Sequence, residues 1–339
     1  MDERISQAVA RVPSAVRASA FALALCSGFS ASFLALAPVA TAQDRCPELD
    51  PEVNRLLRTM TDSTARGDYS GVLTLQRGND MQVMQLSHRV VDGVATEVLS
   101  RLTGQDALVL RTEHPTDCTH PGHRLLKAAS ALENGVCGLA AGYRFHLDSG
   151  ERIAGRDALR LRADPRDMYR FGYVFELDRE TALMLKSTTY GADQRVLEQY
   201  QFASLSMDSV STDGLPSMND SLEDAGVAYR AGHPHPSEPQ PQSTGPAWIV
   251  TWLPDGFMAT DASPPGAPRK SFTDGLASFS VFLEPLKVAI KPGEGVERQG
   301  STVAYTRGVA LQQRPVLITV VGEIPTNTAR MVADAVRLR

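Results

Sequence analysis

The sequence predicts an α+β fold that is mainly β and is divided into two domains. Short runs of alternating apolar and polar residues, separated by turn residues, recur from residue 69 to 205 and again from 248 to 321. Such spacing is typical of antiparallel sheets. A segment rich in Ser, Asp, Gly and Pro separates the two regions and is too polar to supply much hydrophobic core. The length of 339 residues agrees with about two domains.

The first 42 residues are typical of a secretory signal peptide. Three arginines precede an uncharged stretch rich in Ala, Leu and Phe, which ends in Ala40-Thr41-Ala42. A basic region, an apolar region and small residues, in that order, mark a cleaved export signal, so we expect cleavage between Ala42 and Gln43. An uncleaved membrane anchor is the alternative, because the stretch is long enough to span a bilayer, but Pro38 and several small polar residues interrupt it.

Two helices are expected in the N-terminal domain, which we place at residues 43–206. Apolar residues recur at helical spacing between Val53 and Met60 and follow Asp50-Pro51, a pair that suits an N-cap and a first helical position. This predicts a helix over Leu49–Arg66. The second helix is expected at Leu125–Leu132.

The strands of this domain begin with a hairpin. Tyr69–Gln76 and Met81–His88 alternate in polarity on either side of the Asn79-Asp80 turn, as paired antiparallel strands do. Further strands are expected at Glu97–Leu102, Ala107–Thr112, Tyr143–Leu147, Ala158–Ala163, Tyr169–Leu177, Leu183–Thr189 and Val196–Leu205.

A linker at residues 207–246 and a smaller domain at residues 247–339 complete the predicted organisation. The apolar residues between Ala329 and Val336 fall on one face of a helix, which predicts a final helix from Asn327 to about Leu338. Strands of this domain are expected at Trp248–Leu253, Phe279–Leu283, Thr302–Arg307 and Pro315–Val321.

Charge and the absence of motifs argue against several functions. The net charge is −5, from 34 basic and 39 acidic residues, so there is no basic field to attract nucleic acid. The chain has no G-x-S-x-G, S-x-x-K, H-E-x-x-H, Walker or G-x-G-x-x-G motif. We therefore expect no catalytic residues, no cofactor and no nucleic-acid partner.

One cluster of histidines and cysteines could carry chemistry. Cys118 and Cys137 could form a disulfide in an oxidising compartment, and they could instead join His114, His120 and His123 in a zinc site or remain unpaired thiols. We expect the disulfide and no metal. Cys46 is then left over, because an export signal that contains Cys26 would be removed.

A dense Arg/Asp region runs from Arg152 to Arg170. A solvated network of ion pairs at a strand connection is the expected interpretation, and recognition of an anion or a peptide by the arginine forks is the alternative.

Several ordered motifs resemble a known family. They are Arg152-Ile-Ala-Gly-Arg156, Asp164-Pro-Arg-Asp-Met-Tyr-Arg-Phe-Gly-Tyr173, Leu177-Asp178 followed by Leu183-Met-Leu-Lys-Ser187, Trp252-Leu-Pro-Asp-Gly-Phe257, Phe272-Thr-Asp-Gly-Leu-Ala-Ser-Phe-Ser-Val-Phe282 and Val320-Val-Gly-Glu-Ile-Pro-Thr-Asn-Thr328. In this order they resemble the RseB/MucB family of periplasmic regulators of the envelope-stress sigma factor. The segment between His114 and Cys137 is not recognised as part of that pattern.

The resemblance implies an N-terminal domain similar to the lipoprotein carriers LolA and LolB, which is a half-open antiparallel β-barrel with helices, and a C-terminal domain of sheet and helix. It also implies a periplasmic protein that binds the periplasmic part of a single-span anti-sigma factor and shields it from the site-1 protease. Lipopolysaccharide or misplaced lipoproteins would relieve the block. No catalysis is implied.

A half-open barrel suggests a cavity for an acyl chain, because alternate residues of a strand share one face. The candidate lining residues are Leu73, Leu75, Met84, Leu86, Tyr173, Phe175 and Leu177; a filled core is the alternative. The candidate partner-binding residues are Phe272, Asp274, Phe279 and Phe282, whose phenylalanines could equally belong to the core.

The leading hypothesis is thus a periplasmic regulator that holds an anti-sigma factor and releases it when an amphiphile binds. A lipoprotein or lipid carrier is the alternative and would need only residues 43–206. A periplasmic hydrolase is a third hypothesis, since motif searches miss convergent active sites. The sequence leaves open whether the chain forms a homo-oligomer.

Overall fold

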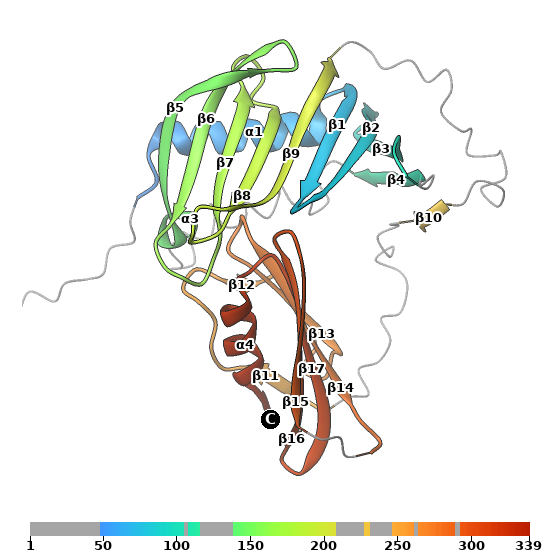
Figure 1. Ribbon diagram of the computed structural model, residues 1–339, viewed down its shortest axis with the longest axis vertical. Helices are drawn as coiled ribbons and strands as arrows, with labels where there is room; N and C mark the ends of the chain where they lie inside the picture. Colours follow the sequence, from blue (N-terminus) through green and yellow to red (C-terminus); the bar gives the residue numbers. More distant parts are fainter. Residues whose placement is uncertain are drawn as a thin grey trace, which may run out of the picture. The chain divides into compact units, whose positions relative to one another are not determined.

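The computed structural model describes residues 48–104, 108–115, 138–207, 227–230, 246–260, 264–288 and 292–339 (Figure 1). The predictions for Ala42 and Gln43, for Cys118 and Cys137, and for a helix at Leu125–Leu132 concern residues outside these ranges and stay predictions. None of the described helices has the length and apolar character needed to cross a membrane.

Helix α1 (Pro51–Arg66) is confirmed close to its predicted bounds. The Asp50 side chain accepts a hydrogen bond from the backbone N–H of Glu52 at 2.7 Å, and proline occupies the first turn, where a missing N–H costs nothing. The helix ends at Gly67, whose N–H donates to the carbonyl of Ser63. Its apolar face is buried.

The sheet of the N-terminal domain has ten strands in the order β10-β4-β3-β2-β1-β9-β8-β7-β6-β5, of which β10 comes from the segment that was predicted to be linker. The strands are β1 (Tyr69–Arg77), β2 (Asp80–Val91), β3 (Val94–Arg101), β4 (Leu108–Pro115), β5 (Tyr143–Ile153), β6 (Arg156–Pro165), β7 (Gly172–Asp178), β8 (Met184–Tyr190), β9 (Val196–Ser206) and β10 (Val227–Arg230). All neighbours are antiparallel except β10 and β4, which are parallel. The short helix α3 (Gly138–Gly142) leads into β5.

The sheet is curved and open, as the half-open barrel prediction requires. In the described residues its edge strands, β5 and β10, do not pair with each other. Helix α1 runs behind the strands from β5 to β9 (Figure 1). Its residues Val53 and Leu57 share a core cluster with Tyr173, Phe175 and Leu177 of β7, three residues of one parity on one strand face.

Strand β7 begins later than predicted. The expected strand Tyr169–Leu177 was wrong at its start, because residues 169–171 form an irregular bend before Gly172. The Asp167 carboxylate accepts the backbone N–H of Tyr169 at 2.9 Å, and this local bond competes with strand geometry. The consequence is that Arg170 lies outside the sheet ladder.

The C-terminal domain is a six-stranded sheet in the order β12-β13-β14-β17-β16-β15, with a separate two-stranded ladder of β11 and β18. The elements are β11 (Trp248–Val250), β12 (Met258–Ala259), β13 (Arg269–Thr273), β14 (Ser278–Pro285), β15 (Gly293–Gln299), β16 (Thr302–Leu311), β17 (Arg314–Gly322), α4 (Thr326–Asp334) and β18 (Val336–Leu338). The predicted final helix is therefore too long at its C-terminus, because residues 336–338 pair with β11.

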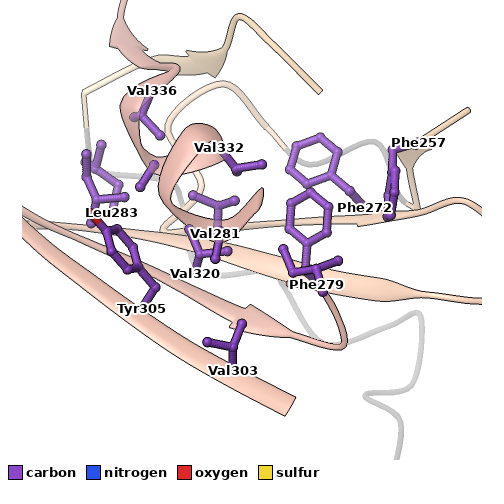
Figure 2. Packing of buried hydrophobic residues seen from close by; sticks show 14 of the residues in the cluster. Phe257, Phe272, Phe279, Val281, Leu283, Val303, Tyr305, Val320, Val332 and Val336 are labelled. Atoms are coloured by element: carbon purple, nitrogen blue, oxygen red, sulfur yellow. The ribbon is translucent and has the colours of Figure 1, made fainter. Parts of the chain in front are cut away.

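One face of this sheet and helix α4 enclose a single core cluster (Figure 2). Phe279, Val281 and Leu283 of β14 point into it, together with Val320 of β17 and Val332 of α4. The intervening residues of β14 lie on the opposite face, where Phe282 is exposed. The alternation predicted for β14 and β17 is confirmed.

The stability contribution of this core can be tested with two phenylalanines of β14. Phe279 is 2% exposed and Phe282 is 38% exposed. We expect Phe279→Ala to lower the free energy of unfolding by about 3–5 kcal/mol, because it leaves a cavity in the core, and Phe282→Ala to lower it by at most about 1 kcal/mol. Urea unfolding followed by circular dichroism measures the free energy of unfolding of both variants. Equal losses would contradict the placement of Phe279 on the buried face of β14 and of Phe282 on the exposed face.

Candidate ligand cavity and domain junction

A cavity of about 300 Å³ lies against the inner face of the N-terminal sheet, at the lower end of the range for small-molecule sites. Its apolar wall is formed by Met60 of α1, Tyr173 and Phe175 of β7, Met184 of β8 and Tyr200 of β9. The phenol of Tyr200 donates to the backbone carbonyl of Met184 at 2.7 Å, which fixes the ring, and burial raises the pKa of this phenol well above its ordinary value.

The C-terminal domain supplies another part of the wall. Gly275 and Leu276, in the turn between β13 and β14, line the cavity, as do Ser301 and Glu323. The Ser301 hydroxyl donates to the Glu198 carboxylate at 3.0 Å across the two domains. The cavity is therefore bounded by both domains.

A buried ion pair joins the two domains beside this cavity. The Arg170 guanidinium donates to the Asp274 carboxylate at 2.8 Å, and both side chains are almost completely buried. Arg170 also donates to the Asp167 carboxylate at 2.9 Å and to the backbone carbonyl of Asp255 at 2.6 Å. The Tyr143 hydroxyl donates to Asp274 at 3.1 Å. Three segments distant in sequence therefore meet at one guanidinium.

Asp274 also organises the turn in which it lies. Its other carboxylate oxygen accepts the backbone N–H groups of Leu276 at 3.0 Å and Ala277 at 2.8 Å. Gly275 has a φ of +104°, a region that side chains rarely adopt. Burial raises the pKa of Asp274 above its ordinary value, and the Arg170 charge and these donors oppose the rise. The Asp274 carboxylate thus stabilises its own turn and also binds Arg170 at the junction.

The seven predicted cavity residues divide into three groups. Tyr173 and Phe175 line the cavity, whereas Leu177 is packed in the adjoining core. Leu73, Leu75, Met84 and Leu86 belong to a separate cluster with Tyr69 and Phe202. A lipid-binding role for any of them stays a prediction.

The four predicted partner-binding residues also differ in position. Phe272 and Phe279 are in the C-terminal core, Asp274 is in the junction, and Phe282 is exposed. Their role in partner binding stays a prediction, for which Phe282 has the accessible side chain.

The arginine-rich region forms ion pairs, as expected, but the network is not solvated throughout, because the carboxylates of Asp178 and Glu176 are buried. Arg156 pairs with Asp178 at 2.5 Å, and Arg160 pairs with Glu176 at 2.5 Å. Although burial acts to raise it, hydrogen bonds from Arg156 and Thr181 lower the pKa of Asp178 below its ordinary value. Arg170 differs from the others because its partner Asp274 is in the other domain.

The sequence did not indicate Met60, Met184, Tyr200 or Leu276 as cavity residues. A usable signal existed only for Leu276, because an apolar residue directly after Asp-Gly, in a turn, needs a partner outside its own strand. Within the described ranges no group of three or more His, Cys, Asp or Glu residues could hold a metal ion.

Comparisons with known proteins agree with both domains. The family model of the MucB/RseB N-terminal domain matches residues 52–219, and that of the C-terminal domain matches residues 242–337. The chain is 30% identical over 293 residues to the sigma factor AlgU regulatory protein MucB of Pseudomonas aeruginosa, covering 83% of this chain and 89% of that protein. It is 24% identical to the sigma-E factor regulatory protein RseB of Salmonella typhimurium, covering 86% and 92%.

Solved structures show the same architecture. The complex structure of Pseudomonas aeruginosa MucA/MucB contains a chain that is 27% identical, with a TM-score of 0.65, covering 85% of this chain and 99% of that one. A crystal structure of MucB in complex with MucA(peri) gives 27% identity and a TM-score of 0.64, covering 84% and 98%.

The buried ion pair predicts a clear contrast between two arginines. We expect Arg170→Met to lower the free energy of unfolding by about 3–5 kcal/mol, because it leaves Asp274 buried without its cation. Arg162 forms an ion pair with Asp164 at 3.3 Å but its side chain is 45% exposed, so Arg162→Met should cost less than about 1 kcal/mol. Denaturant unfolding of both variants checks this, and a cost for Arg170→Met as small as that for Arg162→Met would refute it.

Proposed function

Because this chain belongs to the MucB/RseB family, we propose that it is a regulator of a sigma factor and acts by binding the periplasmic part of an anti-sigma factor. The observation that carries the proposal is the similarity over both domains to MucB chains whose structures were solved with MucA. A binding protein of this kind performs no covalent step. Such a protein acts by stabilising one form of its partner relative to the others.

In the proposed mechanism, the bound segment of the anti-sigma factor is shielded from the site-1 protease. An amphiphile, such as lipopolysaccharide or the acyl chain of a lipoprotein, releases the segment and so relieves the restraint on the sigma factor. The apolar cavity between α1 and strands β7–β9 supports this proposal, because burial of each methylene group of an acyl chain is worth about 0.8 kcal/mol. The release follows when the amphiphile binds better to the free form than to the complex.

Binding to the anti-sigma segment tests the proposal directly. We expect the exported chain to bind the purified segment, measured by isothermal titration calorimetry, and to slow its cleavage by the site-1 protease. Addition of an amphiphile should restore cleavage. No binding by the full exported chain would refute the proposal.

Phe282 provides a test of the partner surface. We expect Phe282→Ala to weaken segment binding roughly tenfold, because exposed aromatic side chains commonly act as binding anchors. Met331 of α4 is equally exposed, at 38%, and Met331→Ala is the matched control that should leave the affinity unchanged. Equal affinities for both variants and the wild type would remove Phe282 from the proposed surface.

A lipoprotein or lipid carrier is the second candidate, favoured by the cavity alone. A carrier would deliver the amphiphile to an acceptor protein or membrane without any effect on the anti-sigma segment. The protease experiment above separates the two functions, because only the regulator protects the segment. Sedimentation of the same samples determines whether several copies of the chain assemble.

The proposed place of action is the periplasm. We expect N-terminal sequencing of the protein from the periplasmic fraction to begin at Gln43, because the small residues Ala40-Thr41-Ala42 suit signal peptidase. A mature protein that retained the apolar segment would contradict the predicted signal.

A further inference from the structure

The turn from Thr273 to Ala277 belongs to the cavity and to the domain junction at once. We propose that this turn couples occupancy of the cavity by an uncharged apolar chain to the contact between the two domains. The inference deepens the proposed function and rests on its amphiphile site. In this proposal the turn is a wall of the cavity that can move, and Leu276 and Asp274 hold that wall in position.

Leu276 forms the side of the turn that faces the cavity. It lines the cavity and packs against the core cluster of the N-terminal domain, although it belongs to the C-terminal domain. A chain that extends along the cavity past Tyr173 and Met184 therefore meets Leu276. The ligand and Leu276 compete for the same apolar contacts.

Asp274 forms the side of the turn that faces the junction. Its carboxylate binds Arg170 and Tyr143 of the N-terminal domain and two backbone N–H groups of its own turn. A further bond inside the turn joins the Thr273 hydroxyl to the carbonyl of Ala277 at 2.7 Å. Because these bonds make the turn compact, a displacement of Leu276 also displaces the carboxylate from Arg170.

The other walls of the cavity are less free to move. Strands β7, β8 and β9 are held by antiparallel ladders, each with a single irregularity near one end, and Met60 lies on a capped helix. The turn approaches the N-terminal domain by side-chain contacts. A cavity of about 300 Å³ is small for an extended amphiphile, so a longer chain must move a wall, and the turn is the wall that can yield.

The charges at the cavity decide which head group suits it. Two carboxylates, Glu198 and Glu323, are among its lining residues, and the described residues that line it include no Lys, Arg or His. Glu198 is paired with Arg77 at 3.3 Å, so an added anion would find no available cation there. An uncharged head is therefore the appropriate probe.

The chain contains its own reporter of the junction. Tyr169, before β7, contacts Trp252 of the C-terminal domain edge-on, with ring centroids 5.3 Å apart. The Thr328 hydroxyl of α4 donates to the carbonyl of Tyr169 at 2.9 Å. The chain has two tryptophans, and Trp248 is buried in the C-terminal core. Opening of the junction should expose Trp252 and shift its emission to longer wavelength.

The experiment titrates the full exported chain with dodecyl maltoside below its critical micelle concentration, and follows tryptophan emission and, by calorimetry, binding. Wild type should bind with a saturable red shift, whereas hexyl maltoside, which has the same head, should give none. Trp252→Phe should bind equally without the shift. Failure of the wild type to bind, or binding without a shift, would overturn the proposal.

Two variants test the two sides of the turn. Leu276→Ala should bind the probe several-fold more tightly with a smaller shift, because less of the wall has to move. Asp274→Asn keeps the oxygen that caps the turn but loses the charge that faces Arg170, so its emission should be shifted before ligand is added and its affinity should rise several-fold. Leu99→Ala changes a half-buried leucine of the separate cluster; it is the control and should match wild type.

Unchanged affinity and shift in both turn variants would overturn the coupling, as would equal effects of Leu99→Ala. None of these measurements contains the anti-sigma segment. Loss of segment binding with the coupling intact would therefore refute only the proposed function, and segment binding without the coupling would refute only this inference.

Discussion

The arrangement of both domains depends on the buried contact between Arg170 and Asp274. A charge taken out of water is costly, and the cost is offset only when its partners are complete. Here the guanidinium has Asp167, Asp274 and the carbonyl of Asp255, and it lies over the rings of Tyr143 and Phe257 at 5.4 and 5.2 Å. Such a set of partners is available in one relative position of the domains, so the ion pair specifies that position.

This contact also gives the cavity its boundary. An open antiparallel sheet with one helix on its inner face leaves apolar surface that a single domain does not cover. The turn anchored by Asp274 places Leu276 against that surface, and the Ser301–Glu198 hydrogen bond adds a second tie. The shape of any surface that both domains form together would therefore depend on whether a ligand occupies the cavity.

Local patterns predicted most of the fold, because they depend on neighbours in sequence. The predicted β1–β2 hairpin is confirmed, but its turn consists of Gly78 and Asn79 and not of Asn79 and Asp80, because Asp80 pairs with Arg77. Strand β15 was missed because its sequence, Gly293–Gln299, is mostly polar and has no alternation of apolar residues. Residues 336–338 continued a helical pattern, yet pairing with β11 made them a strand, which is a tertiary effect that no local pattern contains.

The site was less predictable for the same reason. Strand parity correctly grouped Tyr173, Phe175 and Leu177 on one face, but it also selected Leu73 and Leu86, whose strands form another cluster. Which apolar face borders a cavity depends on the curvature of the sheet and on the turn that covers it. Arg170 and Asp274 are 104 residues apart, and neither the Arg/Asp region nor the Phe272–Phe282 motif indicated that they would pair.

The energies involved make the junction suitable for a threshold response. Loss of one partner of a buried ion pair costs about 3–5 kcal/mol, whereas each buried methylene group returns about 0.8 kcal/mol. Opening of the junction hydrates both charges and so costs less than the loss of one partner, and a few methylene groups beyond those that fit the resting cavity would offset it. A shorter chain would bind without separating Arg170 from Asp274. Because a ligand shifts an equilibrium only by its differential affinity for the two states, chain length rather than abundance would decide which amphiphiles open the junction.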